Sequence, residues 1–368
     1  MSAEPKPEAM PPEPRADERA APPAAFGSHP RTIRAARVRS AMWIVGGLGL
    51  ALAIALVVRA GIPGIRQLLD VAGWRLLWLA PIHIAPLALD ATGWRRLLRG
   101  VRAPGRIYLT WAAVVREAVS GLLPVARVGG EVVGARLLIR RGVAGTIAGA
   151  SVIVELTLTM GAQLLFAGMG LVLLLSYPTT GATPRLVALG LAVGVLAVAA
   201  FFLVQHRWGM FELIERVLRA MVGRDVLRAV GNPARLDQAI RTMYREHRAL
   251  VACTAWQLAG LCAGAIELWI TLRLLGQPSS VRASFVVESL TMAVQSAMFF
   301  VPAGLGTQEG SFVLVGMAVG LSPEVALALS LARRVRQLLL GVPALIGWYG
   351  EERLAARERR HAPRETMR

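Results

Sequence analysis

Apolar runs long enough to cross a lipid bilayer recur along this chain, and they restrict what it can fold into. An α-helix needs about 17 to 25 predominantly apolar residues to cross about 30 Å of hydrocarbon, and residues 146–175 and 249–272 meet that requirement. The 368 residues are 55% hydrophobic and 17% charged, whereas soluble domains are about 45 to 50% apolar and about 25% charged. The sequence therefore predicts an integral membrane protein with an all-α fold.

The apolar runs divide into full crossings and interrupted segments. We expect six full crossings, at residues 42–58, 76–89, 146–175, 185–204, 249–272 and 324–349. Two further apolar stretches, 107–142 and 285–320, are interrupted by clusters of proline, glycine and charged residues. Each is either a re-entrant hairpin or a pair of broken spans, and both alternatives return the chain to the side from which it came. The predicted topology is therefore the same for either choice.

The positive charge indicates how the chain is oriented. The formal net charge is +18, which in a soluble protein would suggest nucleic-acid binding. Here the arginines gather at 31–39, 95–106 and 207–248, whereas segments 176–184 and 275–283 carry one arginine between them. Because arginine-rich loops stay in the cytoplasm, we expect a multi-pass membrane protein with both termini in the cytoplasm, and no nucleic-acid partner.

Outside the apolar runs, composition predicts three further regions. Residues 1–40 are rich in proline, alanine and glutamate near their start, which is typical of a disordered tail. Residues 206–248 mix apolar and charged residues at helical spacing, and we expect an amphipathic connector along the cytoplasmic face. Residues 350–368 form a basic cytoplasmic tail. A partner-binding role for the connector is an alternative to a simple solvated linker.

The two interrupted segments resemble each other, which suggests an internal repeat. Related positions lie 178 residues apart, or one residue fewer upstream of an alignment gap. The matched pairs are Pro124 with Pro302, Glu131 with Glu309, Gly142 with Gly320, Glu155 with Arg333, and Asp90 with Glu267. Each unit, 41–175 and 185–349, then contains three full crossings. Because three is odd, the second unit enters the membrane from the opposite side, which gives an inverted-topology repeat; a chance match is the alternative.

Inverted repeats place their broken helices near the membrane midplane, where these helices form the substrate site. Irregular backbone at that depth is tolerated only where protein or water satisfies its polar groups. The proline and glycines of 285–320 therefore predict helix ends inside the membrane. A harmless kink is the alternative for either segment considered alone.

Ionisable residues inside apolar segments are the candidate functional groups, since they are costly there and tend to be paired. The predicted path residues are Pro124, Arg127, Glu131, Glu155, Pro302, Gly306, Gln308, Glu309, Arg333, Arg334 and Arg336, with Asp90, Glu117, Glu267 and Glu288 as secondary candidates. Arg333 and Arg336 share a helical face and suit a phosphate or carboxylate, or they neutralise Glu309. Glu155 is likewise predicted to neutralise Arg127 or Arg136. Static salt bridges are the alternative for every pair.

Some candidates receive a smaller role or none. Asp90 and Glu267 lie near the predicted membrane interfaces, so we expect them to snorkel toward water. The histidines, among them His83, are scattered without metal-ligand spacing, and the sequence predicts no metal site and no cofactor. Hydrolase, metalloprotease, P-loop and dinucleotide-binding motifs are missing from the sequence. Catalysis is therefore not expected.

The motifs around both interrupted segments resemble a known family. They are P-x-G-L-G-x-Q-E-G at 302–310, L-S-L-x-R-R-x-R at 329–336, and P-x-x-R-x-G-x-E at 124–131. The chain, over about residues 40–350, is similar to the lysylphosphatidylglycerol synthase transmembrane-region family of flippase-like proteins. Within that family it resembles the branch associated with hopanoid biosynthesis.

The resemblance implies a multi-pass protein of the bacterial inner membrane that moves an amphiphilic lipid, such as a hopanoid, between membrane leaflets. Members that aminoacylate lipids carry an additional soluble transferase domain, which we do not expect here. Two other functions stay open: a scaffold that docks lipid-biosynthesis enzymes, and a membrane-embedded enzyme that modifies a lipid. The sequence does not predict the lipid, the transport direction, the energy source or the oligomeric state.

Overall fold

The structure, a computed structural model, describes residues 62–122, 128–175, 233–298 and 306–361, together with isolated helical positions between 192 and 199. Several sequence predictions lie outside these residues. They are the tail 1–40, the crossings at 42–58 and 185–204, much of the connector 206–248, and the path residues Pro124, Arg127 and Pro302.

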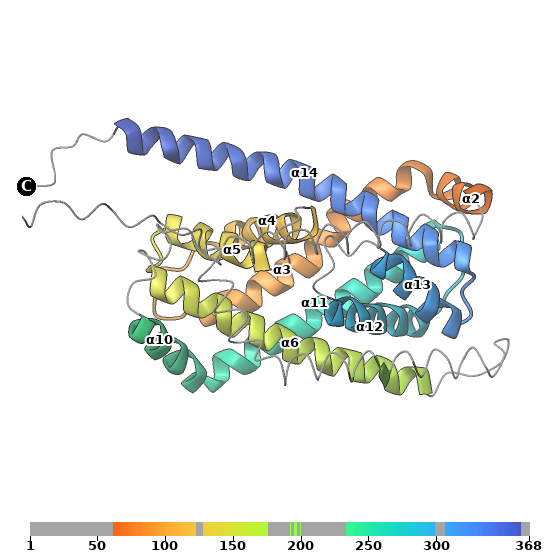
Figure 1. The fold of residues 1–368 in the computed structure, drawn as a ribbon, viewed down its shortest axis with the longest axis horizontal. Helices are drawn as coiled ribbons and strands as arrows, with labels where there is room; N and C mark the ends of the chain where they lie inside the picture. Colours follow the sequence, from red (N-terminus) through yellow and green to blue (C-terminus); the bar gives the residue numbers. More distant parts are fainter. Residues whose placement is uncertain are drawn as a thin grey trace, which may run out of the picture. The chain divides into compact units, whose positions relative to one another are not determined.

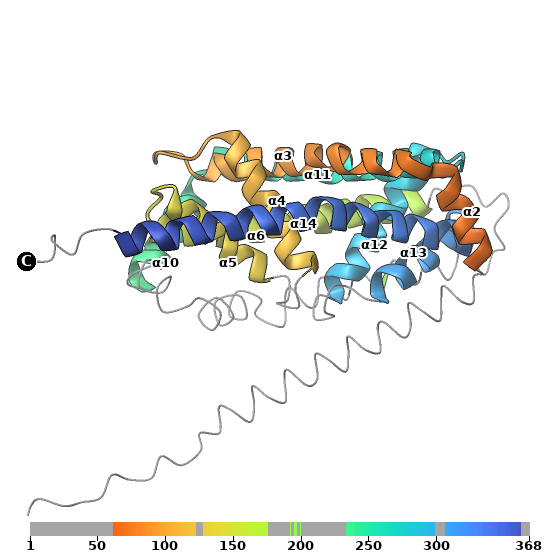
Figure 2. The same ribbon diagram turned by 90° about the horizontal axis from the view of Figure 1, so that it is seen from above.

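The described residues are helical and contain no strand. The helices are α2 (Ile62–Ala72), the 3-10 helix η2 (Gly73–Trp78), α3 (Leu79–Leu97), α4 (Arg106–Leu122), α5 (Val128–Arg140), α6 (Gly145–Leu175), α10 (Pro233–Arg245), α11 (His247–Leu274), α12 (Val281–Ala297), α13 (Thr307–Ala318) and α14 (Pro323–His361). In Figure 1, α14 and α6 run along opposite sides of the bundle, and Figure 2 shows α3 and α11 together along one edge of it. The all-α prediction is confirmed for this part of the chain.

Among the described residues, three helical stretches are long and apolar enough to cross a membrane: Arg66–Leu97, Gly145–Leu175 and His247–Leu274. The predicted crossings at 76–89, 146–175 and 249–272 fall inside them. The sixth predicted crossing, 324–349, is helical within α14 but is not one of the three. This helix also continues to His361, well into the segment predicted as a basic tail.

Each interrupted apolar stretch consists of two helices. Helices α4 and α5 cover most of the described residues of 107–142, and α12 and α13 cover most of those of 285–320. Both α5 and α13 end at a glycine in the left-handed region, with φ of 85° at Gly142 and 86° at Gly320. Each glycine N–H donates back into its helix, to Ile139 at 3.0 Å and to Met317 at 3.1 Å. A left-handed glycine is a common helix C-terminal cap, so these matched glycines have the same structural role.

Helices α3 and α11 pack closely against each other (Figure 2). They are antiparallel: His83, early in α3, meets Glu267, late in α11, while Gly93 lies beside Cys253 near the start of α11. A Cβ at Gly93 would lie 3.1 Å from the Cys253 carbonyl oxygen, so the missing side chain permits the close approach.

The remaining helix contacts follow a reciprocal pattern. Helix α4 packs against α5 and against α14, whereas α12 packs against α13 and against α6. Helix α5 contacts α6 as α13 contacts α14, and α2 contacts α14 as α10 contacts α6. Exchanging each helix of 62–175 for its counterpart in 233–361 therefore leaves this set of contacts unchanged.

Buried apolar residues form two main clusters, and polar residues lie between them on three helices. One cluster includes Leu79, Leu268 and Ala332, and the other includes Leu87, Cys253 and Ala344. On α3, α11 and α14 the chain passes from one cluster to the other. His83, Glu267 and the arginines of 333–336 occupy or adjoin these transitions. The fold thus brings ionisable side chains together between two apolar cores.

Candidate functional site

The central cluster consists of His83, Glu117, Glu267 and Arg336, each from a different helix. His83 places its Nδ1 atom 2.6 Å from the Glu267 carboxylate. Its Nε2 atom lies 2.9 and 3.1 Å from the two carboxylate oxygens of Glu117. Arg336 donates a hydrogen bond to Glu267 and lies 3.6 Å from Glu117. The cluster therefore ties α3, α4, α11 and α14 together through charged groups.

Burial differs across the central cluster. The side chains of Glu267 and Arg336 are 5% and 6% exposed, whereas that of Glu117 is 35% exposed. A pocket of about 20 Å³ is lined by His83, Glu117 and Arg336 together with apolar residues of α4 and α14. A volume of this size has room for about one water molecule, and the three ionisable side chains are its polar neighbours. Glu117 is therefore the most exposed member of the cluster, and it lies beside this pocket.

The first-half cluster consists of Arg116, Glu131 and Glu155. Arg116 donates a hydrogen bond to Glu131 and lies 2.7 Å from Glu155. Its guanidinium group also stacks 4.7 Å from the centre of the buried Trp94 ring, a cation–π contact. A Cβ at Gly134 would lie 2.7 Å from the Arg116 side chain, so this glycine of α5 makes room for it.

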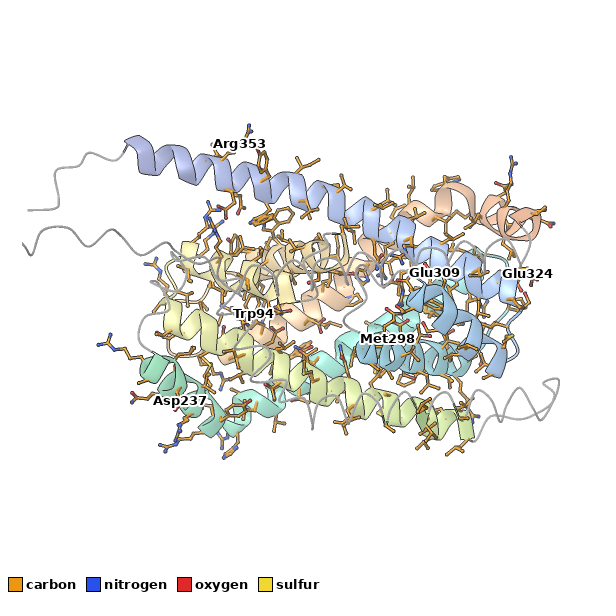
Figure 3. The ribbon with its side chains drawn as sticks, in the orientation of Figure 1. Trp94, Asp237, Met298, Glu309, Glu324 and Arg353 are labelled. Atoms are coloured by element: carbon orange, nitrogen blue, oxygen red, sulfur yellow. The ribbon has the colours of Figure 1, made fainter. Side chains whose placement is uncertain are left out.

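The second-half pairs are Arg333 with Glu288 and Arg334 with Glu309. Arg334 lies 3.2 Å from Glu309, whose other oxygen accepts the Gly306 N–H at 2.8 Å. A carboxylate in the first turn satisfies an unpaired backbone donor and the positive end of the helix dipole. Figure 3 shows Glu309 inside the bundle, between α13 and α14. Helix α13 thus begins with a charged, hydrogen-bonded first turn.

Carboxylates outnumber guanidinium groups among the interior candidates of the described helices. The carboxylates are Asp90, Glu117, Glu131, Glu155, Glu267, Glu288 and Glu309, and the guanidinium groups are Arg116, Arg333, Arg334 and Arg336. Every one of these arginines is paired with a carboxylate. In contrast, the buried Oδ1 atom of Asp90, which faces Gly260, has no hydrogen-bond partner within the described part of the chain. Among these described groups, a carboxylate oxygen thus remains without a partner, whereas the four arginines are all paired.

The structure brings most of the predicted residues into these three groups, but with different partners. Glu309 is neutralised by Arg334, not by Arg333 or Arg336. Glu155 pairs with Arg116. Arg136 instead contacts Glu352 on the extension of α14, at 2.7 Å. Gln308 donates to Ser330 of α14 at 3.1 Å and holds the start of α13 in place. The secondary candidates Glu117 and Glu288 join the charged groups as well.

The expectation that Glu267 snorkels toward water is wrong. Its side chain is buried and contacts both His83 and Arg336. The expected interface position came from its place near the end of an apolar run. Helix α3 covers that surface because the two helices cross closely there. Asp90, its counterpart in the repeat, likewise lies against α11.

Sequence reasoning missed two functional candidates, His83 and Arg116. His83 lies seven residues before Asp90 in an apolar run, so both polar groups occupy similar faces of α3. Arg116 directly precedes Glu117 in the equally apolar 107–122 segment. A charged or titratable residue inside an apolar helix is a functional-site signal by itself, and that signal was present at both positions.

The family of the chain follows from its sequence match. Residues 43–346 match the profile of the family described as "Lysylphosphatidylglycerol synthase TM region". The chain belongs to this family. No curated protein and no solved structure matches the chain. The lysylphosphatidylglycerol synthase transmembrane-region family consists of membrane proteins tied to lipid handling, so the interior charged groups are those of a lipid-handling membrane protein.

Proposed function

We propose that this protein moves an amphiphilic lipid between the leaflets of the bacterial cytoplasmic membrane. The observation that carries the proposal is the set of charged groups that both halves contribute to the bundle interior. Buried ion pairs are costly to form in an apolar medium and add little net stability. Charged residues inside membrane segments therefore mark substrate or ion pathways by default.

The proposal includes an inverted-topology repeat with six full spans, two broken hairpins and both termini in the cytoplasm. Its support is the reciprocal pattern of helix contacts and the matched left-handed glycines, Gly142 and Gly320. The antiparallel α3–α11 pair adds to this, because two-fold related helices cross with opposite chain directions. A lipid head group would cross between the two halves while its tail stays in the hydrocarbon.

The excess of carboxylates favours a lipid whose head group carries an ammonium group. Arg116, Arg333, Arg334 and Arg336 of the described helices each have a carboxylate partner, so an anionic head group that binds one of them would have to displace that carboxylate. An ammonium group instead gains a partner from the excess carboxylates, such as Asp90. The family description names a lipid bearing a lysyl group, whose amines are cationic. The hopanoid branch suggested by the sequence makes an amine-bearing hopanoid a second test lipid.

Leaflet exchange in reconstituted vesicles tests this function. Fluorescent lipids with cationic, zwitterionic and anionic head groups on identical tails are compared in vesicles with and without the protein. We expect the protein to speed exchange of the cationic lipid at least about tenfold over that of the anionic one, equivalent to about 1.4 kcal/mol. Equal rates with and without protein for every lipid would overturn the proposal.

The same experiment separates the two other functions. A scaffold for lipid-biosynthesis enzymes leaves every exchange rate unchanged and retains enzyme partners in pull-down. A lipid-modifying enzyme converts the probe, which mass spectrometry of the recovered lipid detects. We expect the recovered cationic probe to be chemically unchanged after it has crossed the membrane.

A further inference from the structure

His83 has a carboxylate on each of its ring nitrogens. Its Nδ1 atom contacts Glu267 at 2.6 Å, and its Nε2 atom contacts Glu117 at 2.9 Å. A neutral imidazole donates from one nitrogen and carries a lone pair on the other, whereas an imidazolium donates from both. A lone pair facing a carboxylate repels it. The two contacts are therefore satisfied together only when the triad holds one proton more than a neutral histidine and two carboxylates.

The charge of the central cluster supports the same proton count. With that proton, the positive charges of His83 and Arg336 balance the negative charges of Glu117 and Glu267. Without it, the cluster carries one net negative charge between two apolar cores, where an unbalanced charge is strongly disfavoured. When the cluster releases this proton, another cation must therefore take its place.

Neighbouring charged groups do not supply that cation, because they are paired with one another. From α14, Arg333 is held by Glu288 of α12. From α4, Arg116 is held by the carboxylates of the first-half cluster. On α3 itself, Asp90 adds a further carboxylate about two turns away on a similar face. The surroundings therefore do not neutralise the deprotonated cluster.

The proton has a route to water. Glu117 is the partly exposed member of the cluster, and it lines the pocket together with His83. A proton can pass from the imidazolium to Glu117 and on to a water molecule in this pocket. This proton transfer needs no rearrangement of the helices, because Glu117 already contacts His83 and lines the pocket.

We propose that the central cluster is a proton-binding site, and that its proton leaves when the ammonium group of a lipid head group enters. The imidazolium gives its proton to water through Glu117, and the ammonium supplies the replacement positive charge. The inference rests on the proposed function and assigns its energy source, the proton gradient. Because one positive charge replaces one other, the exchange is electroneutral.

The repeat indicates one proton for each transport cycle. Glu267 corresponds to Asp90 in the repeat, and at the same offset His83 corresponds to Gly260. Gly260 faces Asp90 as His83 faces Glu267, but it has no side chain to hold a proton. Within the described helices, the imidazole between carboxylates therefore occurs in one half alone.

Nitrogen NMR of histidine-labelled protein in lipid nanodiscs tests the proton directly, without any transport. At pH 7.5 an exposed histidine is mostly neutral, since its reference pKa is about 6.5. We expect one imidazole with both nitrogens protonated at this pH. That signal is assigned by its loss in His83→Gln and its retention in the control His247→Gln. A neutral His83 signal at pH 7.5 would overturn the inference.

Transport against a pH difference tests the coupling. The probe is a fluorescent lipid with a quaternary-ammonium head group, which does not release a proton itself. With one pH unit across the vesicle membrane, we expect it to accumulate up to about tenfold in the leaflet on the acidic side. A potassium-diffusion potential should produce no accumulation, because the exchange is electroneutral. In His83→Gln the ratio between leaflets should fall to about one.

Failure of the inference and failure of the function give different results. If the probe exchanges between leaflets but does not accumulate under the pH difference, the proposed lipid translocation is supported and proton coupling is contradicted. If the wild-type protein exchanges no lipid at all, the proposed function fails, and the NMR result still decides whether His83 holds the proton.

Discussion

Replacing Arg116 with alanine is expected to lower the free energy of unfolding by about 3 to 5 kcal/mol, the cost of removing one partner of a buried charge pair. Arg116 serves two carboxylates, Glu131 and Glu155, and its side chain is 13% exposed. Its removal leaves both carboxylates in an apolar interior without a counter-charge. Denaturant titration of the protein in detergent micelles measures the change.

The destabilisation caused by Arg116→Ala should be partly reversed when Glu131 and Glu155 are also changed to glutamine, since the uncompensated charges are then gone. The matched control is Arg241→Ala on α10, where the pair with Asp237 is exposed. Exposed pairs contribute little, so the control should stay close to wild type. A loss for Arg116→Ala as small as that of the control would contradict a buried charge cluster.

Arg336→Met is expected to destabilise the protein about as much as Arg336→Ala, again by about 3 to 5 kcal/mol. Methionine keeps most of the apolar stem of the arginine but removes the charge, and Glu267 then has His83 as its remaining partner. Arg336→Lys should fall between these variants and wild type. A lysine ammonium reaches one carboxylate well, whereas the guanidinium fork serves Glu267 and Glu117 together.

The comparison between these variants separates charge from packing. If Arg336→Met were as stable as wild type and Arg336→Ala were not, the contribution of Arg336 would be its stem and not its charge. The positive charge of Arg336 would then not be needed to stabilise the central cluster. Thermal unfolding of the three variants in the same nanodiscs provides an independent measurement.

The sequence predicted features that depend on local chemistry. Apolar length located the helices that contain 146–175 and 249–272. The matched glycines Gly142 and Gly320 were predicted as equivalent, and both adopt the left-handed cap conformation that glycine accommodates at little cost. The candidate carboxylates were found because a charge inside an apolar run is conspicuous.

The sequence did not predict which charges would pair. Arg333 and Arg336 were the predicted partners of Glu309, and its pairing with Arg334 instead depends on the rotation of α14 relative to α13. His83 and Glu267 are 184 residues apart, and they meet because α3 and α11 cross at close range. Such partners follow from helix packing and from small residues at the crossing, which the pattern of a single helix does not encode.

The extension of α14 shows a similar limit. Its end was predicted as a basic tail because it is rich in charged residues. In the structure Glu352 pairs with Arg136, and the Glu351 backbone accepts a bond from Arg140 of α5 at 2.8 Å. Contacts between α14 and α5 thus occur in residues whose composition alone suggests a solvated tail.

Leaflet exchange by Glu131→Gln and Glu309→Gln, measured beside wild type and the exposed control Asp237→Asn, tests the central claim most directly. Each glutamate comes from a different half. Arg116 keeps Glu155 when Glu131 is changed, whereas Glu309→Gln removes the carboxylate that Arg334 contacts, so the stability of both variants is measured beside exchange. The account predicts that both glutamine variants slow exchange of a cationic lipid about tenfold while the control does not. Wild-type exchange rates in both, with folding unchanged, would contradict a path built from the charges of the two halves.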